Sequence, residues 1–263
     1  MFLSMTEAPL PIRPLLSNCT ESELHSIMTA GFASVAGAVL AAYISFGASA
    51  TDLLAATIMY TPGALAISKL VFPETKKISM RQSLFEFEIA ESDDPNMIQI
   101  GGQLIAIIAL IDMLNGWLKG IGTLIDIALS LQIITSYIFF PFAWLMGVPI
   151  EDCLKVASLI GTKIMVNEFA AFAKLALMVD NNTISHKAIT IATYALCGFS
   201  NISSMGVSVG VLSSLVPEKR EVLNKLVTSA MFAGNAACFM TACIAGLFYR
   251  FTRLKRFWRI CRI

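Results

Sequence analysis

The stretch AITIATYALCGFSNISSMGVSVGVLSSLVP, residues 188–217, decides the fold class because thirty consecutive residues carry no charged side chain. About 20 helical residues cross the ~30 Å hydrocarbon core of a bilayer, since each residue adds roughly 1.5 Å. Inside a bilayer every backbone amide needs a partner within the protein, so such runs predict helices. Further uncharged runs cover residues 26–51, 53–68, 127–150 and 226–249. The sequence therefore predicts an all-α, multi-pass membrane protein.

Composition supports the membrane class. Of the 263 residues, 56% are hydrophobic and 14% charged, and the mean hydropathy is +0.73. The net charge of +1 excludes a general attraction to nucleic acid, so we expect no nucleic-acid partner. The six cysteines form no C-x-x-C pair, which argues against a disulfide framework. The opening MFLSMTEAPLPIRPLL, residues 1–16, lacks the pattern of a cleavable signal peptide.

The sequence offers little material for an enzyme. His25 and His186 are the only histidines, and both stand at the ends of candidate spans, where we expect them at the membrane interface. A zinc or serine hydrolase therefore lacks an evident base. An intramembrane hydrolase built on Glu168, Ser34 and Ser204 stays a distant alternative for the same reason.

Charged and proline residues divide the chain into candidate spans and connections. Residues 1–24 are too broken by prolines to span, so a loop or re-entrant segment fits them better. Helices are predicted at 26–46, 52–71, 96–125 and 127–147, then a shorter charge-bearing segment at 152–178, and long spans at 184–215 and 220–249. A polar loop is predicted at 73–95. The basic tail, 250–263, is expected to rest on the cytosolic membrane surface.

Two parts of the chain repeat one pattern: an acid in a short segment precedes a long helix interrupted by small polar residues. The first copy has Glu7 in SMTEAPL followed by GFASVAGAVLAAY from Gly31. The second copy has Glu168 in VNEFAAF followed by GFSNISSMGVSVG from Gly198. Paired interrupted segments are typical of a transporter site near the membrane midplane. The small residues suit close helix packing equally well, which is the simpler interpretation of Gly31, Ser34, Gly37, Gly206 and Gly210.

Glu168 is the first candidate for a functional residue. A carboxylate among apolar neighbours costs at least ~2.5 kcal/mol in lipid, so it should face a partner or a water-filled cavity. Neutralisation by Lys163 or Lys174 is the rival explanation. Asn201 and Ser204 also need hydrogen-bond partners, because they lie in an uncharged run. Interhelical pairing would explain either residue. Beside Phe199 they suggest a pocket that stacks a ring and bonds a sugar.

The segments TEAPLPIRPLL, MTAGFASVAGAVLAAYISFG, GALAISKLVFPE, GTKIMVNEFAAFAKL and CGFSNISSMGV resemble the concentrative nucleoside transporter family, as found in animals. The resemblance extends to about Tyr249. It implies an elevator-type transporter with re-entrant helical hairpins and partly unwound transmembrane helices in an internal repeat. The implied divisions are 1–24, the remainder of the first hairpin; 25–72, the first unwound helix and the next transmembrane helix; 73–95, a polar loop; 96–149, scaffold helices; 150–180, the second hairpin; 181–249, the second unwound helix and last transmembrane helix; and 250–263, a basic tail.

The same resemblance implies a set of binding residues. Glu168, Asn201 and Ser204 would bond the ribose hydroxyls. The base would face the first hairpin and pack on apolar side chains, and the sodium ion would take the Ser34 side chain and backbone oxygens, as hard cations prefer. The residues implied for the base are Met5, Thr6, Glu7, Val39 and Phe199, and those for backbone coordination of sodium are Leu3 and Val35.

Met5 stands where family members often carry Gln, which implies a preference for purine nucleosides, although Ser4 and Ala38 leave the preference open. The implied activity is sodium-coupled nucleoside symport by a homotrimer in the plasma membrane, with lipid as its surroundings. Because Met1 falls inside the first hairpin, a truncated, non-transporting fragment or a regulatory subunit of full-length protomers is the alternative. The family also implies an outside C-terminus, against the cytosolic tail that the positive charges predict.

Overall fold

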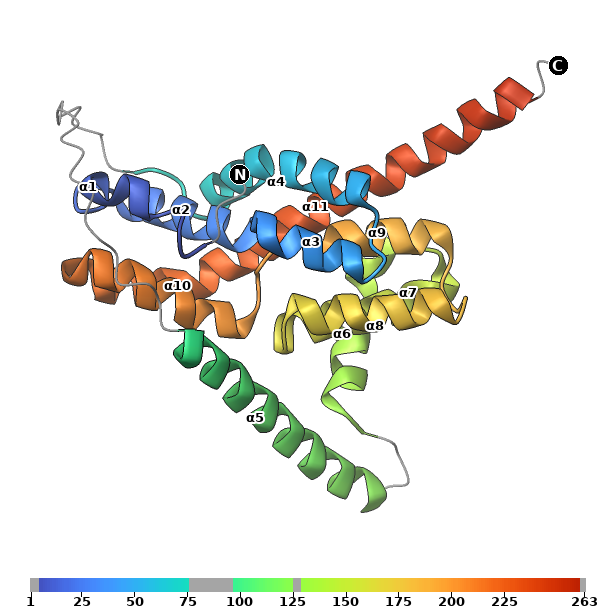
Figure 1. Cartoon of the computed structure of the whole chain (residues 1–263), viewed down its shortest axis with the longest axis horizontal. Coiled ribbons are helices and arrows are strands. Elements are labelled where there is room, and N and C mark those ends of the chain that lie inside the picture. The colour runs from blue at the N-terminus through green and yellow to red at the C-terminus, as the bar shows by residue number, and fades with distance from the viewer. Residues whose placement is uncertain (1–4, 76–96, 125–128, 261–263) are drawn as a thin grey trace.

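The computed structural model describes residues 5–75, 97–124 and 129–260, and these form helices and connecting turns without a strand (Figure 1). The all-α expectation is confirmed for this part of the chain. The predicted loop at 73–95 lies mainly outside the described residues. In chain order the elements are η1 (Leu10–Ile12), α1 (Arg13–Leu16), α2 (Glu21–Ala33), α3 (Gly37–Ser45), α4 (Ala50–Val71), α5 (Met97–Leu124), α6 (Leu131–Leu145), α7 (Ile150–Met165), α8 (Glu168–Asp180), α9 (His186–Leu196), α10 (Ile202–Leu215), η2 (Pro217–Lys219) and α11 (Arg220–Ile260).

Polar side chains just before the helices set where many of them begin. Thr20 and Glu23 form a capping box at α2, in which each side chain accepts a hydrogen bond from the other's backbone N–H. An N-cap of this kind satisfies backbone N–H groups that the first helical turn leaves without partners. The same role belongs to Ser49 at α4, Ser130 at α6, Asn167 at α8, Ser185 at α9 and Asn201 at α10.

Two of the expected spans are each divided into two helices. The expected helix at 26–46 is α2 and α3, joined by extended backbone at residues 34–36. The expected span at 184–215 is α9 and α10, joined at residues 197–201, where Gly198 has φ +106°. We call these segments the first break and the second break. The GF pairs that align the two sequence copies are not equivalent, because Gly31 lies inside α2 whereas Gly198 lies in the second break.

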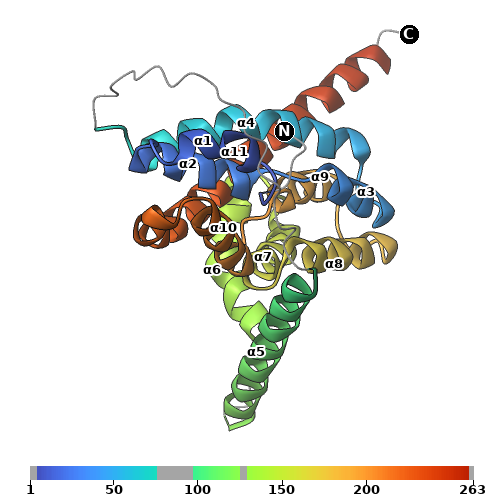
Figure 2. The ribbon, with the colours of Figure 1, turned by 60° about the vertical axis from the view of Figure 1, so that its left-hand side comes forward.

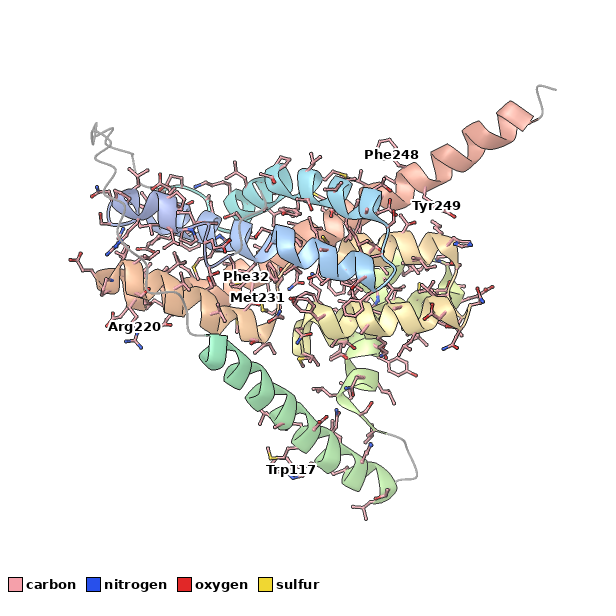
Figure 3. All side chains as sticks on the ribbon, in the orientation of Figure 1. Phe32, Trp117, Arg220, Met231, Phe248 and Tyr249 are labelled. Carbon is pink, nitrogen blue, oxygen red and sulfur yellow. The ribbon has the colours of Figure 1, made fainter. Side chains whose placement is uncertain are left out.

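Helix α11 is the element around which the others are arranged (Figure 1). It packs against α2, α4, α9 and α10, while α6 packs on α7 and α7 on α8. Phe32 of α2 and Met231 of α11 belong to one buried apolar cluster (Figure 3). The backbone of α11 stays helical to Ile260, past the expected end at 249, and this end projects beyond the other helices in both ribbon views (Figures 1 and 2).

Apolar side chains cover much of the outer surface. Ala50–Val71 and Pro217–Tyr249 are long and apolar enough to cross a membrane. On α4, Ile58, Leu65 and Leu70 are all exposed, and such apolar surface suits lipid rather than water. Helix α5 extends away from the body in both ribbon views, with Trp117 exposed on it (Figures 2 and 3).

His25, expected at the membrane interface, is enclosed by other helices. Its side chain is fully buried inside α2, and its Nδ1 lies 2.7 Å from Ser68 Oγ of α4. Its Nε2 lies 3.1 Å from Ser229 Oγ of α11. The histidine therefore joins three helices, which the one-dimensional charge pattern does not reveal. His186, at the start of α9, is exposed.

Candidate functional site

The turn between α7 and α8 positions Glu168. Asn167 ends the turn and caps α8, because its Oδ1 accepts a hydrogen bond of 2.8 Å from Ala170 N–H. Glu168 is then the first residue of α8, where the positive end of the helix dipole stabilises a carboxylate. Its side chain is only 3% exposed, so the carboxyl group lies inside the protein.

The partner of Glu168 comes from the second break. Asn201 Nδ2 donates a hydrogen bond of 2.8 Å to Glu168 Oε2. The Oδ1 of the same amide accepts from Ser204 N at 2.8 Å and from Ser204 Oγ at 2.9 Å, and so caps α10. Asn201 is 2% exposed and Ser204 is also buried. Three of the residues predicted for substrate binding therefore lie together where the N-termini of α8 and α10 meet.

The lysines of the rival explanation for Glu168, Lys163 and Lys174, do not contact its carboxylate directly. Lys163 Nζ donates to the backbone oxygens of Ala195 at 3.0 Å and Cys197 at 3.4 Å, at the end of α9. Lys174 Nζ donates to Ser158 Oγ at 2.6 Å. The ion pairs in the described part of the chain do not include Glu168. The Asn201 amide and the N-terminus of α8 stabilise the carboxylate directly, and the buried ammonium of Lys163 adds an attractive charge without contact.

The first break contains two of the residues predicted for sodium. Ser34 ends α2, and its Oγ donates a hydrogen bond of 2.8 Å to Gly31 O. The buried Val35 is fixed by Tyr60 of α4, whose phenolic oxygen accepts the Val35 N–H at 3.0 Å. The Ser34 hydroxyl donates its hydrogen to Gly31 O, so the lone pairs of Ser34 Oγ point away from that bond. These lone pairs can coordinate a cation. The third predicted sodium residue, Leu3, lies outside the described residues.

The second break packs directly on the end of α2, next to the first break. Ser200 Oγ of the second break donates a hydrogen bond of 2.9 Å to Phe32 O, at the end of α2. Gly198 lies against the same helix end, since a Cβ built there would stand 3.0 Å from Phe32 O and from Ala33 O. Its φ of +106° is also one that favours glycine. A substitution at Gly198 would therefore disturb both breaks.

Helix α11 also packs where the second break meets the end of α2. A Cβ built at Gly234 would stand 2.7 Å from Phe32 Cβ and 2.9 Å from Ser200 Oγ, so the helix touches the second break and the end of α2. The buried amide of Asn235 donates to Ser200 O at 3.1 Å and to Met231 O at 3.3 Å. Cys238 donates its thiol proton to Cys197 O at 2.8 Å.

The residues predicted to contact the base lie in three places. Met5 is half-buried, and its Cβ lies 3.4 Å from a Cβ built at Gly31, next to the first break. Thr6 is half-buried and Glu7 is exposed in the same turn, so the environment of Glu7 differs from that of the buried Glu168. Phe199 is half-buried within the second break.

Val39 lies one helical turn before Tyr43 on α3, so the two share a face of that helix. Tyr43 stacks on Phe172 of α8, with ring centroids 4.2 Å apart, and lies 5.6 Å from the ring of Phe169. The face of α3 that carries Val39 is therefore turned toward the helix that begins at Glu168.

The sequence interpretation missed Tyr60, Ser200 and Asn235, which hold the two breaks in place. Asn235 could have been found by the argument used for Asn201, because it is an amide within an uncharged run. Ser200 and Tyr60 give a weaker signal, since hydroxyl groups are common in membrane helices and usually bond their own backbone; Ser204 was singled out only together with Asn201.

Comparisons with known proteins agree on one family. The family described as "Na+ dependent nucleoside transporter C-terminus" matches residues 52–246. The chain is 42% identical over 275 residues to solute carrier family 28 member 3 of Rattus norvegicus, covering 94% of this chain and 39% of the relative. It is 40% identical over 278 residues to sodium/nucleoside cotransporter 1 of Homo sapiens, covering 95% of this chain and 43% of the relative. The chain thus spans about two fifths of the length of these curated relatives.

Solved structures give the same result. CNTnw in an inward-facing substrate-bound state matches with a TM-score of 0.84 and 37% identity, over 94% of this chain and 62% of that one. A variant of CNTnw in an outward-facing state matches with a TM-score of 0.82 and 36% identity, over the same shares of both chains. The chain therefore belongs to the family of Na+ dependent nucleoside transporters and matches the C-terminal portion of its members.

Proposed function

We propose that the protein is a sodium-coupled symporter of nucleosides. The structural observation that carries this proposal is the hydrogen bond between Glu168 and Asn201, which joins a buried carboxylate to an amide at two helix N-termini. Buried ionisable groups in membrane proteins are costly, and they usually line substrate or ion pathways. The names of relatives at about 40% identity, which are cotransporters, support transport over a purely structural role.

In this proposal the Glu168 carboxylate, Asn201 and Ser204 bind the ribose. A carboxylate accepts from several donors at once, and two adjacent sugar hydroxyls supply the donors that fit it. Asn201 Nδ2 already occupies one position on Oε2, so ribose binds at the remaining lone pairs or displaces the amide. Met5, Thr6, Glu7, Val39 and Phe199 contact the base. We keep Met5 as the basis of a preference for purines, because a thioether lacks the amide donor of Gln.

Sodium binds at the first break in this proposal, through the Ser34 hydroxyl and the backbone oxygens of Val35 and Leu3. The carboxyl end of α2 points its carbonyl groups there, and a helix C-terminus favours a cation. Oxygen donors at an interrupted helix are typical of sodium sites in transporters. The direct packing of Ser200 on Phe32 then gives sodium a physical route to the Asn201 side of the site.

The proposed transport mechanism and assembly are based on the family to which the chain belongs. We propose that residues before α2 and the α7–α8 pair act as re-entrant hairpins, that both broken helices are partly unwound transmembrane helices, and that the loaded unit moves as an elevator. We also propose a homotrimer in the plasma membrane. The contrast between the body and the projecting α5 is consistent with a moving part and a scaffold (Figures 1 and 2).

The test is uptake of labelled adenosine and uridine, with and without sodium, by cells expressing the protein. We expect sodium-dependent uptake that favours adenosine. Glu168→Gln keeps the size of the side chain but removes the charge that accepts the ribose hydroxyls, so uptake should fall by about tenfold to a thousandfold, the effect of ~1.4–4 kcal/mol. Glu151→Gln, at the start of α7, is the matched control for losing an acid, and uptake should stay near the wild-type level because Glu151 is exposed and outside the proposed site.

A different outcome would support the alternative function, a regulatory subunit. If the protein reaches the membrane and leaves sodium-dependent uptake unchanged by itself, but alters the uptake of a co-expressed full-length relative, it is a regulatory subunit. Adenosine and uridine uptake that needs no sodium would overturn the symport proposal.

A further inference from the structure

Lys163 is a charged residue that the proposed function does not use. It lies on α7, five residues before Glu168, and its side chain is 0% exposed. A lysine is almost never fully buried unless its ammonium has partners. Here the partners are the backbone oxygens of Ala195, at 3.0 Å, and Cys197, at 3.4 Å. Both oxygens belong to the carboxyl end of α9, at the second break.

The first break has the same helix geometry but a different chemistry. At the end of α2 the donors to the backbone oxygens are neutral, because Ser34 donates to Gly31 O and Ser200 donates to Phe32 O. A helix C-terminus carries partial negative charge, and its carbonyl oxygens are good ligands for a cation. One break therefore has a cation of the protein's own, while the other presents a serine hydroxyl.

We propose that Lys163 is the built-in cation of the second break, holding at the end of α9 the position that sodium takes at the end of α2. This inference rests on the proposed sodium site at the first break. It makes Lys163 a positioning residue: its ammonium holds the end of α9 so that Asn201, four residues beyond Cys197, faces Glu168. It also leaves the chain with sodium acting at the first break alone.

The inference explains why the second break tolerates Glu168 without a second sodium ion. The buried carboxylate and the buried ammonium lie on the same hairpin and add no net charge, although they are not in contact. At the first break the corresponding acid, Glu7, is exposed, and the charge balance there is left to a mobile ion. Each half of the repeat would thus have a cation at its helix end: the Lys163 ammonium at the second break and a sodium ion at the first.

The test compares the sodium dependence of nucleoside uptake by the wild type and by Lys163→Ser. Serine removes the ammonium and leaves space in which sodium and water can reach the two carbonyl oxygens, so a second sodium ion can enter. We expect the wild type to show a hyperbolic dependence with one charge moved per nucleoside. In Lys163→Ser the dependence should become sigmoidal, and half-maximal uptake should need about 5- to 150-fold more sodium, the usual range of coupling between sites.

Lys174→Ser is the matched control. It removes a lysine that lies six residues after Glu168 and whose Nζ donates to Ser158 Oγ of α7, not to a backbone oxygen at the end of α9. Its sodium dependence should stay hyperbolic. A purely structural role for Lys163 would lower the amount of protein or its thermal stability without changing the shape of the sodium curve.

Three results would overturn the inference. One is a Lys163→Ser variant that transports with the sodium curve of the wild type. Another is a folded variant that stays inactive at every sodium concentration. The third needs no variant, so it holds even if Lys163→Ser fails to fold: two charges per nucleoside in the wild type would mean that sodium already acts at a second position. Sodium-independent uptake by the wild type would instead contradict the proposed function itself.

Discussion

Asn235 of α11 is a buried amide that stabilises the second break through one hydrogen bond. Its Nδ2 donates to Ser200 O at 3.1 Å, and the side chain is 3% exposed. Asn235→Leu keeps the volume but leaves the Ser200 carbonyl without this donor, and a buried polar group left unpaired costs about 1–3 kcal/mol. We expect a lower thermal unfolding midpoint in detergent, together with weaker nucleoside binding, because Ser200 precedes Asn201 in the site.

Thr241→Val is the matched control on the same helix. The Thr241 hydroxyl is buried too, but it donates to Cys238 O of its own helix at 2.8 Å. Its loss should lower the unfolding midpoint less and leave nucleoside affinity unchanged. Equal losses of affinity in the two variants would show that the amide of Asn235 has no particular role at the break.

At the scale of helices, the approach of α11 to both breaks depends on Gly234. Alanine there would place its Cβ 2.7 Å from Phe32 Cβ, which is attached to the backbone, and 2.9 Å from Ser200 Oγ, which is held by its hydrogen bond to Phe32 O. Gly234→Ala should therefore push α11 away from the end of α2 and from the second break. We expect it to destabilise the protein by about 1–3 kcal/mol, as overpacking does. The unfolding midpoint and nucleoside affinity should fall together.

Gly120→Ala, on α5, gives the comparison without a clash. Nothing lies within 4 Å of a Cβ built at Gly120 among the described residues, and alanine favours the helix over glycine by about 1 kcal/mol. That variant should be neutral or slightly more stable. If Gly234→Ala were as stable as Gly120→Ala, the close contact at the two breaks would not be a constraint on the fold.

Across the whole molecule, the sequence could predict what depends on polarity along the chain. Glu168, Asn201 and Ser204 were predicted because a polar group in an apolar run must have a partner, and the structure joins them by hydrogen bonds. The observed α4 and α5 run close to the expected spans at 52–71 and 96–125. These predictions need only local composition.

What the sequence could not predict depends on which helix faces which. Ser200 and Phe32 are 168 residues apart, and their contact follows from the way α2 and α9 end at the same point. The direction of the Lys163 side chain, toward α9 and not toward Glu168, is likewise set by packing. The partners of His25 could not be predicted for the same reason, since the two serines come from two other helices.

The contact between the second break and the end of α2 predicts how sodium and nucleoside affect each other's binding. By thermodynamic necessity, sodium must tighten nucleoside binding by the factor by which nucleoside tightens sodium binding, commonly about 5- to 150-fold. The hydrogen bond from Ser200 Oγ to Phe32 O links the proposed sodium break to the proposed nucleoside break. Ser200→Ala removes a net contribution of about 1 kcal/mol, so the factor should fall about fivefold. Titrating purified protein with each ligand, with and without the other, measures this factor. Sodium affinity in the absence of nucleoside should change little. A Ser200→Ala variant with the full coupling factor would show that the two breaks communicate by another route, such as the contacts of α11.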